Sequence, residues 1–198
     1  MQKKLHKKLF SLLIFSAEYS RQNSISTYTK YLDEAASDLL LSLFSSIQGM
    51  YKPAKLVLRC SIENFLKSML SIIDPMIINE KLIFSIFDKA KYDPHFIGTI
   101  GSKVLGSLQS DYSTLCRTVH SAPSEIHTTS ALNLLPHYSQ QHFSELSSLF
   151  IRTTENFLSV LYVNYPVIVD RMHPENKADF LDCLSKSIKK SVVEQLYG

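Results

Sequence analysis

Residues 111–121 read DYSTLCRTVHS, and their spacing predicts the helix around which the fold is organised. One seam of this predicted helix is made of apolar residues at helical intervals, Leu105, Leu108, Tyr112, Leu115 and Val119. Pro123 follows the stretch, so we expect the helix to end near His120.

Polar side chains lie beside this seam. Ser113, Arg117 and His120 share one flank of the predicted helix. Arg117 and His120 are three residues apart, so a guanidinium and an imidazole can face one bound anion. The negative end of the helix dipole favours the imidazolium form, which suits a proton donor. This helix alone leaves two interpretations of His120 open, a surface histidine at a helix end and an acid–base group.

The composition predicts a single-domain, all-α protein. The chain has 198 residues, of which 45% are hydrophobic and only five are glycine. Alternating runs bounded by turn signals, which would indicate strands, are not found. Cys60, Cys116 and Cys183 are far apart and form no C-x-x-C pair, so neither a disulfide framework nor a thiolate zinc site is expected. A reducing cytoplasm is the expected location.

The N-terminus combines lysines with an apolar run. The opening MQKKLHKKLFSLLIFSA imitates a secretory signal, but Phe15 occupies a position where a small residue would precede a cut after Ala17. The run 9–15 is too short to span a bilayer, so no integral membrane association is expected. We expect an amphipathic helix over 1–21, and a polar linker over 22–27 before the main bundle at 28–198. The inner face of the N-terminal helix is expected to hold Leu5, Leu9, Leu12 and Leu13, with the lysines outside. This basic helix leaves open a further interpretation, attachment to nucleic acid or to a membrane surface.

Helices are predicted at about 28–48 and 53–73, and a short turn joins them into an antiparallel hairpin. The apolar sector of the second helix contains Leu58, Ile62, Phe65, Leu66, Met69, Leu70, Ile72 and Ile73. Arg59 falls inside this sector, and a buried guanidinium needs a partner. Glu63, four residues on, is the expected partner. An internal ion pair without function and a functional cation are both compatible with this pattern.

Further helical segments follow from capping signals. Asp74-Pro75 and Asp93-Pro94 each read as an N-cap with a first-turn proline, and three glycines predict that the second segment is short or broken. The connection 123–139 is long and polar. A helix is expected over 140–170, bent near Pro166, and a last helix from Pro174. No residues have the spacing of a metal site, and we interpret His137 and His142 as surface histidines.

Two stretches together resemble a known family. YLDEAASDLLLSLFSSIQGMYKPAKLVLRCSIENFLKSML, residues 31–70, is followed about fifty residues later by YSTLCRTVHSA. Their order and spacing resemble bacterial members of the HEPN superfamily, over roughly residues 31–161. The family signature places four to six residues between an arginine and a histidine, whereas Arg117 and His120 enclose two. The resemblance therefore leaves open whether Arg117 or Arg59 is the working cation.

The resemblance implies a bundle of four or five core helices, usually a homodimer, that acts as a metal-independent endoribonuclease without a cofactor. Such proteins are common in prokaryotic toxin–antitoxin and phage-defence systems, so an antitoxin or defence-system protein is an expected partner besides RNA. The implied catalytic residues are His120, Arg117, Arg59 and Glu63. The implied substrate-binding residues are Ser121, Tyr112 and Ser113. The alternative is a catalytically silent bundle that binds a partner protein or a nucleotide and regulates a neighbouring effector.

Overall fold

The computed structural model describes residues 2–22, 26–119 and 137–197. These residues form nine α-helices and two short 3-10 helices, η1 and η2, with no β-strand among them. The all-α prediction is confirmed. The elements are α1 (Gln2–Gln22), α2 (Thr27–Ile47), α3 (Tyr51–Leu70), η1 (Pro75–Asn79), α4 (Ile83–Ala90), η2 (Pro94–Phe96), α5 (Gly98–Val119), α6 (Gln140–Asn164), α7 (Pro166–Asp170), α8 (Pro174–Asp182) and α9 (Lys186–Tyr197).

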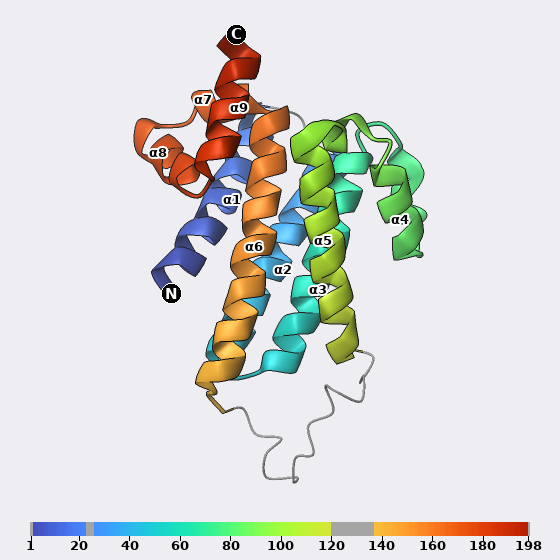
Figure 1. The fold of residues 1–198 in the computed structure, drawn as a ribbon, viewed down its shortest axis with the longest axis vertical. Coiled ribbons are helices and arrows are strands. Elements are labelled where there is room, and N and C mark those ends of the chain that lie inside the picture. The colour runs from blue at the N-terminus through green and yellow to red at the C-terminus, as the bar shows by residue number, and fades with distance from the viewer. Residues whose placement is uncertain (1, 23–25, 120–136, 198) are drawn as a thin grey trace.

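The long helices α2, α3, α5 and α6 run roughly along the long axis of the molecule, with α5 and α6 in front of α2 and α3 in Figure 1. The helix α1 crosses beside α6, while α7, α8 and α9 gather at one end and α4 flanks α5. The core lies between these layers. At its centre the rings of Phe65 on α3 and Phe157 on α6 stack with centroids 3.9 Å apart.

The hairpin of α2 and α3 is confirmed, and local sequence explains its ends. Ser26 caps α2 in a capping box with Thr29. Gly49 has φ of +77°, which closes the turn after α2. A Cβ at this position would lie 2.3 Å from the carbonyl oxygen of His137, so only glycine fits here. The Ser42 hydroxyl donates to the Ala54 carbonyl at 2.9 Å and ties the two helices together.

The inner face of α1 differs from the prediction at two positions. Leu5, Leu9 and Leu12 are buried as expected, but Leu13 is 39% exposed because it lies a further 100° around the helix. Lys8 was expected outside and is instead buried. Its ammonium donates to the Cys183 carbonyl at 2.8 Å and to Glu155 at 3.3 Å, which compensates for the lost water.

Both Asp-Pro signals cap helical turns, as predicted. The carboxylates of Asp74 and Asp93 accept hydrogen bonds from the backbone N–H groups of residues 76 and 95, but the segments that they open are short 3-10 helices. The glycines do not break the helix that follows, since α5 is continuous. Gly101 has a packing role instead, because a Cβ there would lie 2.5 Å from the backbone of Phe96.

Three predicted helix ends are wrong. The helix α3 ends at Leu70, so Ile72 and Ile73 leave the apolar sector and are 43% and 58% exposed. Pro166 does not bend a long helix; α6 ends at Asn164, and Pro166 begins the separate helix α7, where its missing N–H costs nothing. The chain after Pro174 forms two helices, α8 and α9, rather than one.

None of the helices in the described ranges combines the length and the apolar character that crossing a bilayer requires.

Candidate functional site

The side of α5 that faces α3 carries a cation over an aromatic ring. The guanidinium carbon of Arg59 lies 5.3 Å from the centroid of the Tyr112 ring, within range of a cation–π contact. Tyr112 is only 7% exposed, and Phe87 of α4 packs edge-on against it at 5.9 Å. Arg59 itself is half-buried. The structure therefore brings together two of the residues that the sequence singled out, from two different helices.

The expected pair of Arg59 with Glu63 does not form. Glu63 instead contacts Lys67, with Oε1 and Nζ 3.5 Å apart. The pairs Arg59–Glu63 and Glu63–Lys67 both have the i, i+4 spacing, but the guanidinium of Arg59 lies over the Tyr112 ring of α5 instead. Among the residues that the structure describes, Arg59 has no carboxylate partner, and its buried Nε atom has no hydrogen-bond partner. Within the described ranges, therefore, no carboxylate neutralises the charge of this guanidinium.

The surroundings of Arg59 and Tyr112 shift the pKa of both groups. Burial alone would lower the pKa of Arg59, but the phenol of Tyr112 and the thiols of Cys116 and Cys60 raise it overall. Burial raises the pKa of Tyr112 to about 12, although Arg59 opposes the shift. Tyr112 is therefore a neutral phenol at physiological pH. Cys116 is the member of this cluster that sequence reasoning missed, although its position one turn after Tyr112 was a usable signal.

Of the remaining residues predicted from the sequence, some are exposed to solvent and others lie outside the described residues. Ser113 and Arg117 are exposed on α5, and the Ser113 hydroxyl donates to the Gln109 carbonyl of its own helix at 2.8 Å. His120 and Ser121 lie outside the described residues. The last residue of α5 is Val119, which directly precedes His120 in the chain.

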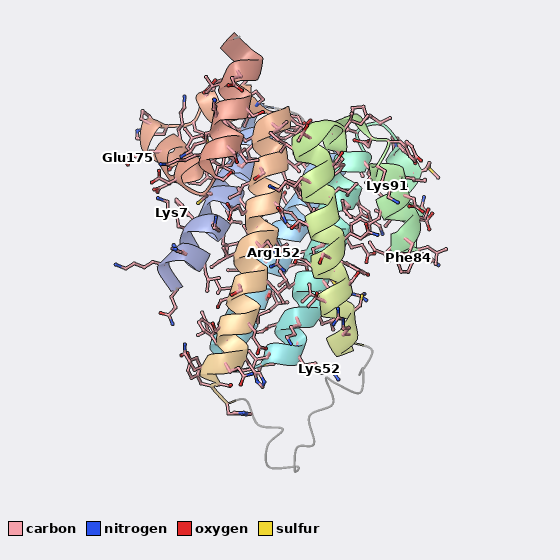
Figure 2. The ribbon with its side chains drawn as sticks, viewed as in Figure 1. Lys7, Lys52, Phe84, Lys91, Arg152 and Glu175 are labelled. Atoms are coloured by element: carbon pink, nitrogen blue, oxygen red, sulfur yellow. The ribbon has the colours of Figure 1, made fainter. Side chains whose placement is uncertain are left out.

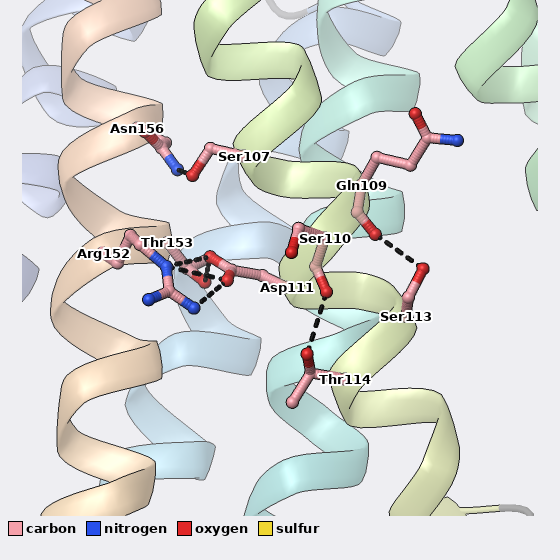
Figure 3. Close-up of polar contacts among 9 residues, drawn as sticks. All are labelled: Ser107, Gln109, Ser110, Asp111, Ser113, Thr114, Arg152, Thr153 and Asn156. Carbon is pink, nitrogen blue, oxygen red and sulfur yellow. Dashed lines mark hydrogen bonds and ion pairs between the residues drawn. The ribbon is translucent and has the colours of Figure 1, made fainter.

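The side of α5 that faces α6 carries a pair that sequence reasoning missed. Asp111 is fully buried, and Arg152 of α6 donates to it from Nε at 2.8 and 3.1 Å and from Nη2. Thr153 adds a contact at 3.4 Å. One turn along, the Asn156 amide donates to the Ser107 hydroxyl at 2.8 Å, as Figure 3 shows. No local pattern marks this pair, because its members are separated by 41 residues.

A groove lies next to this pair, between α5 and α6, and Lys55 of α3 also lines it. Its volume is about 410 Å³. Figure 2 places Arg152 at the centre of this face of the molecule. The lining residues are Lys55, Thr114, Leu115, Glu145, Ser148, Leu149 and Arg152. The Arg152 side chain is half exposed there, so its guanidinium contacts both the buried carboxylate and the groove.

A second polar cluster stands at the far end of the bundle. The carboxylate of Asp93 lies 2.6 Å from Nδ1 of His95, and Nε2 of His95 lies 3.4 Å from the Tyr165 hydroxyl. Tyr165 packs against Tyr19 and Tyr28, with ring centroids 5.3 and 5.8 Å away. Burial raises the pKa of Tyr165 far above its ordinary value. The residue types here resemble a proton relay, but the cluster sits inside aromatic packing and caps η2.

Within the described ranges, no group of three or more histidine, cysteine, aspartate or glutamate side chains could hold a metal ion.

Comparison with family models, with curated proteins and with solved structures finds no match for this chain.

Proposed function

We propose that this protein is a HEPN-type, metal-independent endoribonuclease of a prokaryotic defence or toxin–antitoxin system. The observation that carries the proposal is the state of Arg59. It is a half-buried guanidinium that lies over Tyr112, and no carboxylate among the described residues neutralises it. Keeping such a charge in a bundle is costly unless an anion uses it. A phosphodiester is the anion that the proposed reaction supplies.

The proposed chemistry needs no metal. The 2′-oxygen of the RNA attacks the adjacent phosphorus and the bond to the 5′-oxygen breaks, which leaves a 2′,3′-cyclic phosphate and a 5′-hydroxyl. One group takes the proton of the 2′-hydroxyl, and another returns a proton to the leaving 5′-oxygen. We assign one of these roles to His120, with a second copy of the chain supplying the other. Arg59 or Arg117 stabilises the charge that develops on the phosphate.

Cleavage of RNA in the presence of EDTA tests this proposal. The wild type is expected to cleave, and the His120→Ala variant to lose activity. The His6→Ala variant is the matched control, because His6 is exposed on α1, far along the chain from this site. Mapping the product ends distinguishes this chemistry from metal-dependent hydrolysis. Equal cleavage by the wild type and the His120→Ala variant would contradict the assignment.

The same assay decides between the two arginines. If Arg59 is the working cation, Arg59→Met lowers the rate constant for cleavage by about a hundredfold, the scale of one lost donor to a developing oxyanion. In that case Arg117→Met is expected to change the rate constant only slightly, because Arg117 is exposed on α5. The reverse result assigns the role to Arg117.

A second candidate function is the catalytically silent bundle that binds a partner protein. The observation that favours it is a row of half-exposed apolar side chains on the outer face of α2, formed by Leu40, Leu41, Phe44 and Ile47. Absence of cleavage, together with a stable complex that Phe44→Ser disrupts, would favour this function over the ribonuclease.

A further inference from the structure

The groove between α5 and α6 contains a guanidinium that is held from one side only. Nε and Nη2 of Arg152 donate to Asp111, whereas Nη1 makes no hydrogen bond to any residue that the structure describes. A guanidinium has five N–H donors in a fixed plane. The edge formed by Nη1 and Nη2 therefore keeps a fork of donors directed away from Asp111, and this fork matches the oxygens of a phosphate. Figure 3 shows the guanidinium reaching from α6 to the carboxylate on α5.

Burial of the carboxylate fixes the direction of this fork. Asp111 is fully buried, whereas the Arg152 side chain is 52% exposed. The two bonds to one rigid carboxylate remove most of the rotational freedom that a surface arginine would lose on binding an anion. The guanidinium is thus oriented for a ligand in the groove before that ligand arrives.

The rest of the groove offers groups that suit a ribose. Glu145 precedes Arg152 by seven residues on α6, which is about 10 Å along a helix. The carboxylate of Glu145 accepts hydrogen bonds, and its Oε1 already accepts one from the Gln141 amide at 3.0 Å. The hydroxyl oxygens of Thr114 and Ser148 also accept, and both hydroxyls already donate to their own helices. Donors at one end and acceptors along the walls complement a nucleotide, whose phosphate only accepts and whose 2′-hydroxyl also donates.

We infer that this groove is a second RNA subsite, in which Arg152 binds a backbone phosphate and Glu145 faces the ribose of the same nucleotide. This inference rests on the proposed ribonuclease function, and it adds a binding residue on α6, the helix that packs against α5 at Asp111. Arg152 acts in affinity for the strand rather than in the cleavage step. Leu115 and Leu149 form the apolar part of the groove lining.

Binding of a short fluorescent 2′-fluoro RNA, which lacks the attacking hydroxyl and keeps the backbone phosphates, tests the contact between Arg152 and phosphate by anisotropy. The informative variant is the double substitution Asp111→Asn with Arg152→Gln, because it removes one positive and one negative charge and leaves the net charge unchanged. We expect affinity to fall about tenfold and the slope of log affinity against log salt to decrease by about one. Arg171→Gln is the control, since it removes an exposed arginine from another part of the molecule. It is expected to change affinity less than twofold.

Arg152→Lys provides a second variant that keeps the charge beside Asp111 and loses only the fork. It is expected to weaken binding by several-fold, while its thermal unfolding confirms that it is folded. Unchanged affinity and salt slope in both variants, or no RNA binding by the wild type, would overturn the subsite. If the wild type cleaves RNA and the double variant binds RNA with unchanged affinity, the subsite is wrong and the ribonuclease proposal is retained. If RNA binding depends on Arg152 but the wild type does not cleave RNA, the binding site is retained and the ribonuclease proposal is wrong.

Discussion

On the side that faces α6, α5 carries Asp111, a buried carboxylate that accepts hydrogen bonds from two guanidinium nitrogens of Arg152. On its α3 side, it carries Tyr112, over which Arg59 lies without a carboxylate partner among the described residues. The first side pairs its two charges within the fold, whereas the second holds a cation that no described carboxylate neutralises. Two arginines that both contact α5 thus differ in environment: Arg152 is paired with a buried carboxylate, whereas Arg59 lies against an aromatic ring.

The largest effect on stability is expected on the α6 side. Arg152→Ala leaves the buried Asp111 carboxylate without its cation, and removing one partner of such a pair typically costs 3 to 5 kcal/mol. Half of the Arg152 side chain lies in water, so we expect the free energy of unfolding to fall by about 3 kcal/mol, at the lower end of that range. Urea denaturation measures the change. A loss below about 1 kcal/mol would show that water reaches Asp111 and that the two sides of α5 differ less than the contacts indicate.

A smaller effect, dependent on pH, is expected on the α3 side. Burial raises the pKa of Tyr112 to about 12, so the folded protein keeps this proton after the unfolded chain has lost it. The resulting stability is complete below about pH 10 and is lost as the pH rises toward 12. Because the site is partly solvated, we expect the wild type to lose about 1 kcal/mol more than Tyr112→Phe between about pH 9 and pH 11.5. Urea denaturation at a series of pH values checks this, and parallel curves for the two proteins would contradict it.

The smallest effect is expected for Arg59→Met. This change removes a cation–π contact worth about 0.5 to 1 kcal/mol, but it also removes a buried Nε atom without a partner and keeps the aliphatic stem. The two effects oppose each other, so the free energy of unfolding is expected to change by less than about 1 kcal/mol. Thermal and urea unfolding measure it. A loss above about 2 kcal/mol would assign Arg59 a structural role like that of Arg152 and remove the main support for an anion site.

The fold was predictable wherever short-range signals decide it. Helical periodicity predicted the hairpin of α2 and α3 and the buried seam on α5, and the Asp-Pro pairs predicted two caps. Helix ends were less predictable, because Pro166 can either bend a helix or begin one, and the choice depends on the packing of Tyr165 in the aromatic cluster. Sequence spacing carries no information about that packing.

The candidate site was predictable only in its residue types. The i, i+4 rule favoured Glu63 as the partner of Arg59, but a ring from another helix competed for the guanidinium, and that ring is 53 residues away in the chain. The contact between Asp111 and Arg152 has the same origin, since only the packing of α5 on α6 brings its members together. Long-range contacts between charged groups of this kind have no periodic signature in a single sequence.

The bidentate contact at Asp111 also fixes the axial register of α5. Sliding α5 along α6 by one turn, about 5.4 Å, would take the carboxylate out of reach of Arg152 and leave both charges without this partner. The position of Val119, the last residue of α5, is therefore fixed along α6, about two turns beyond the anchoring residue. A variant that leaves one of these charges unpaired, such as Arg152→Ala, is therefore expected to loosen the position of this helix end as well as to destabilise the fold.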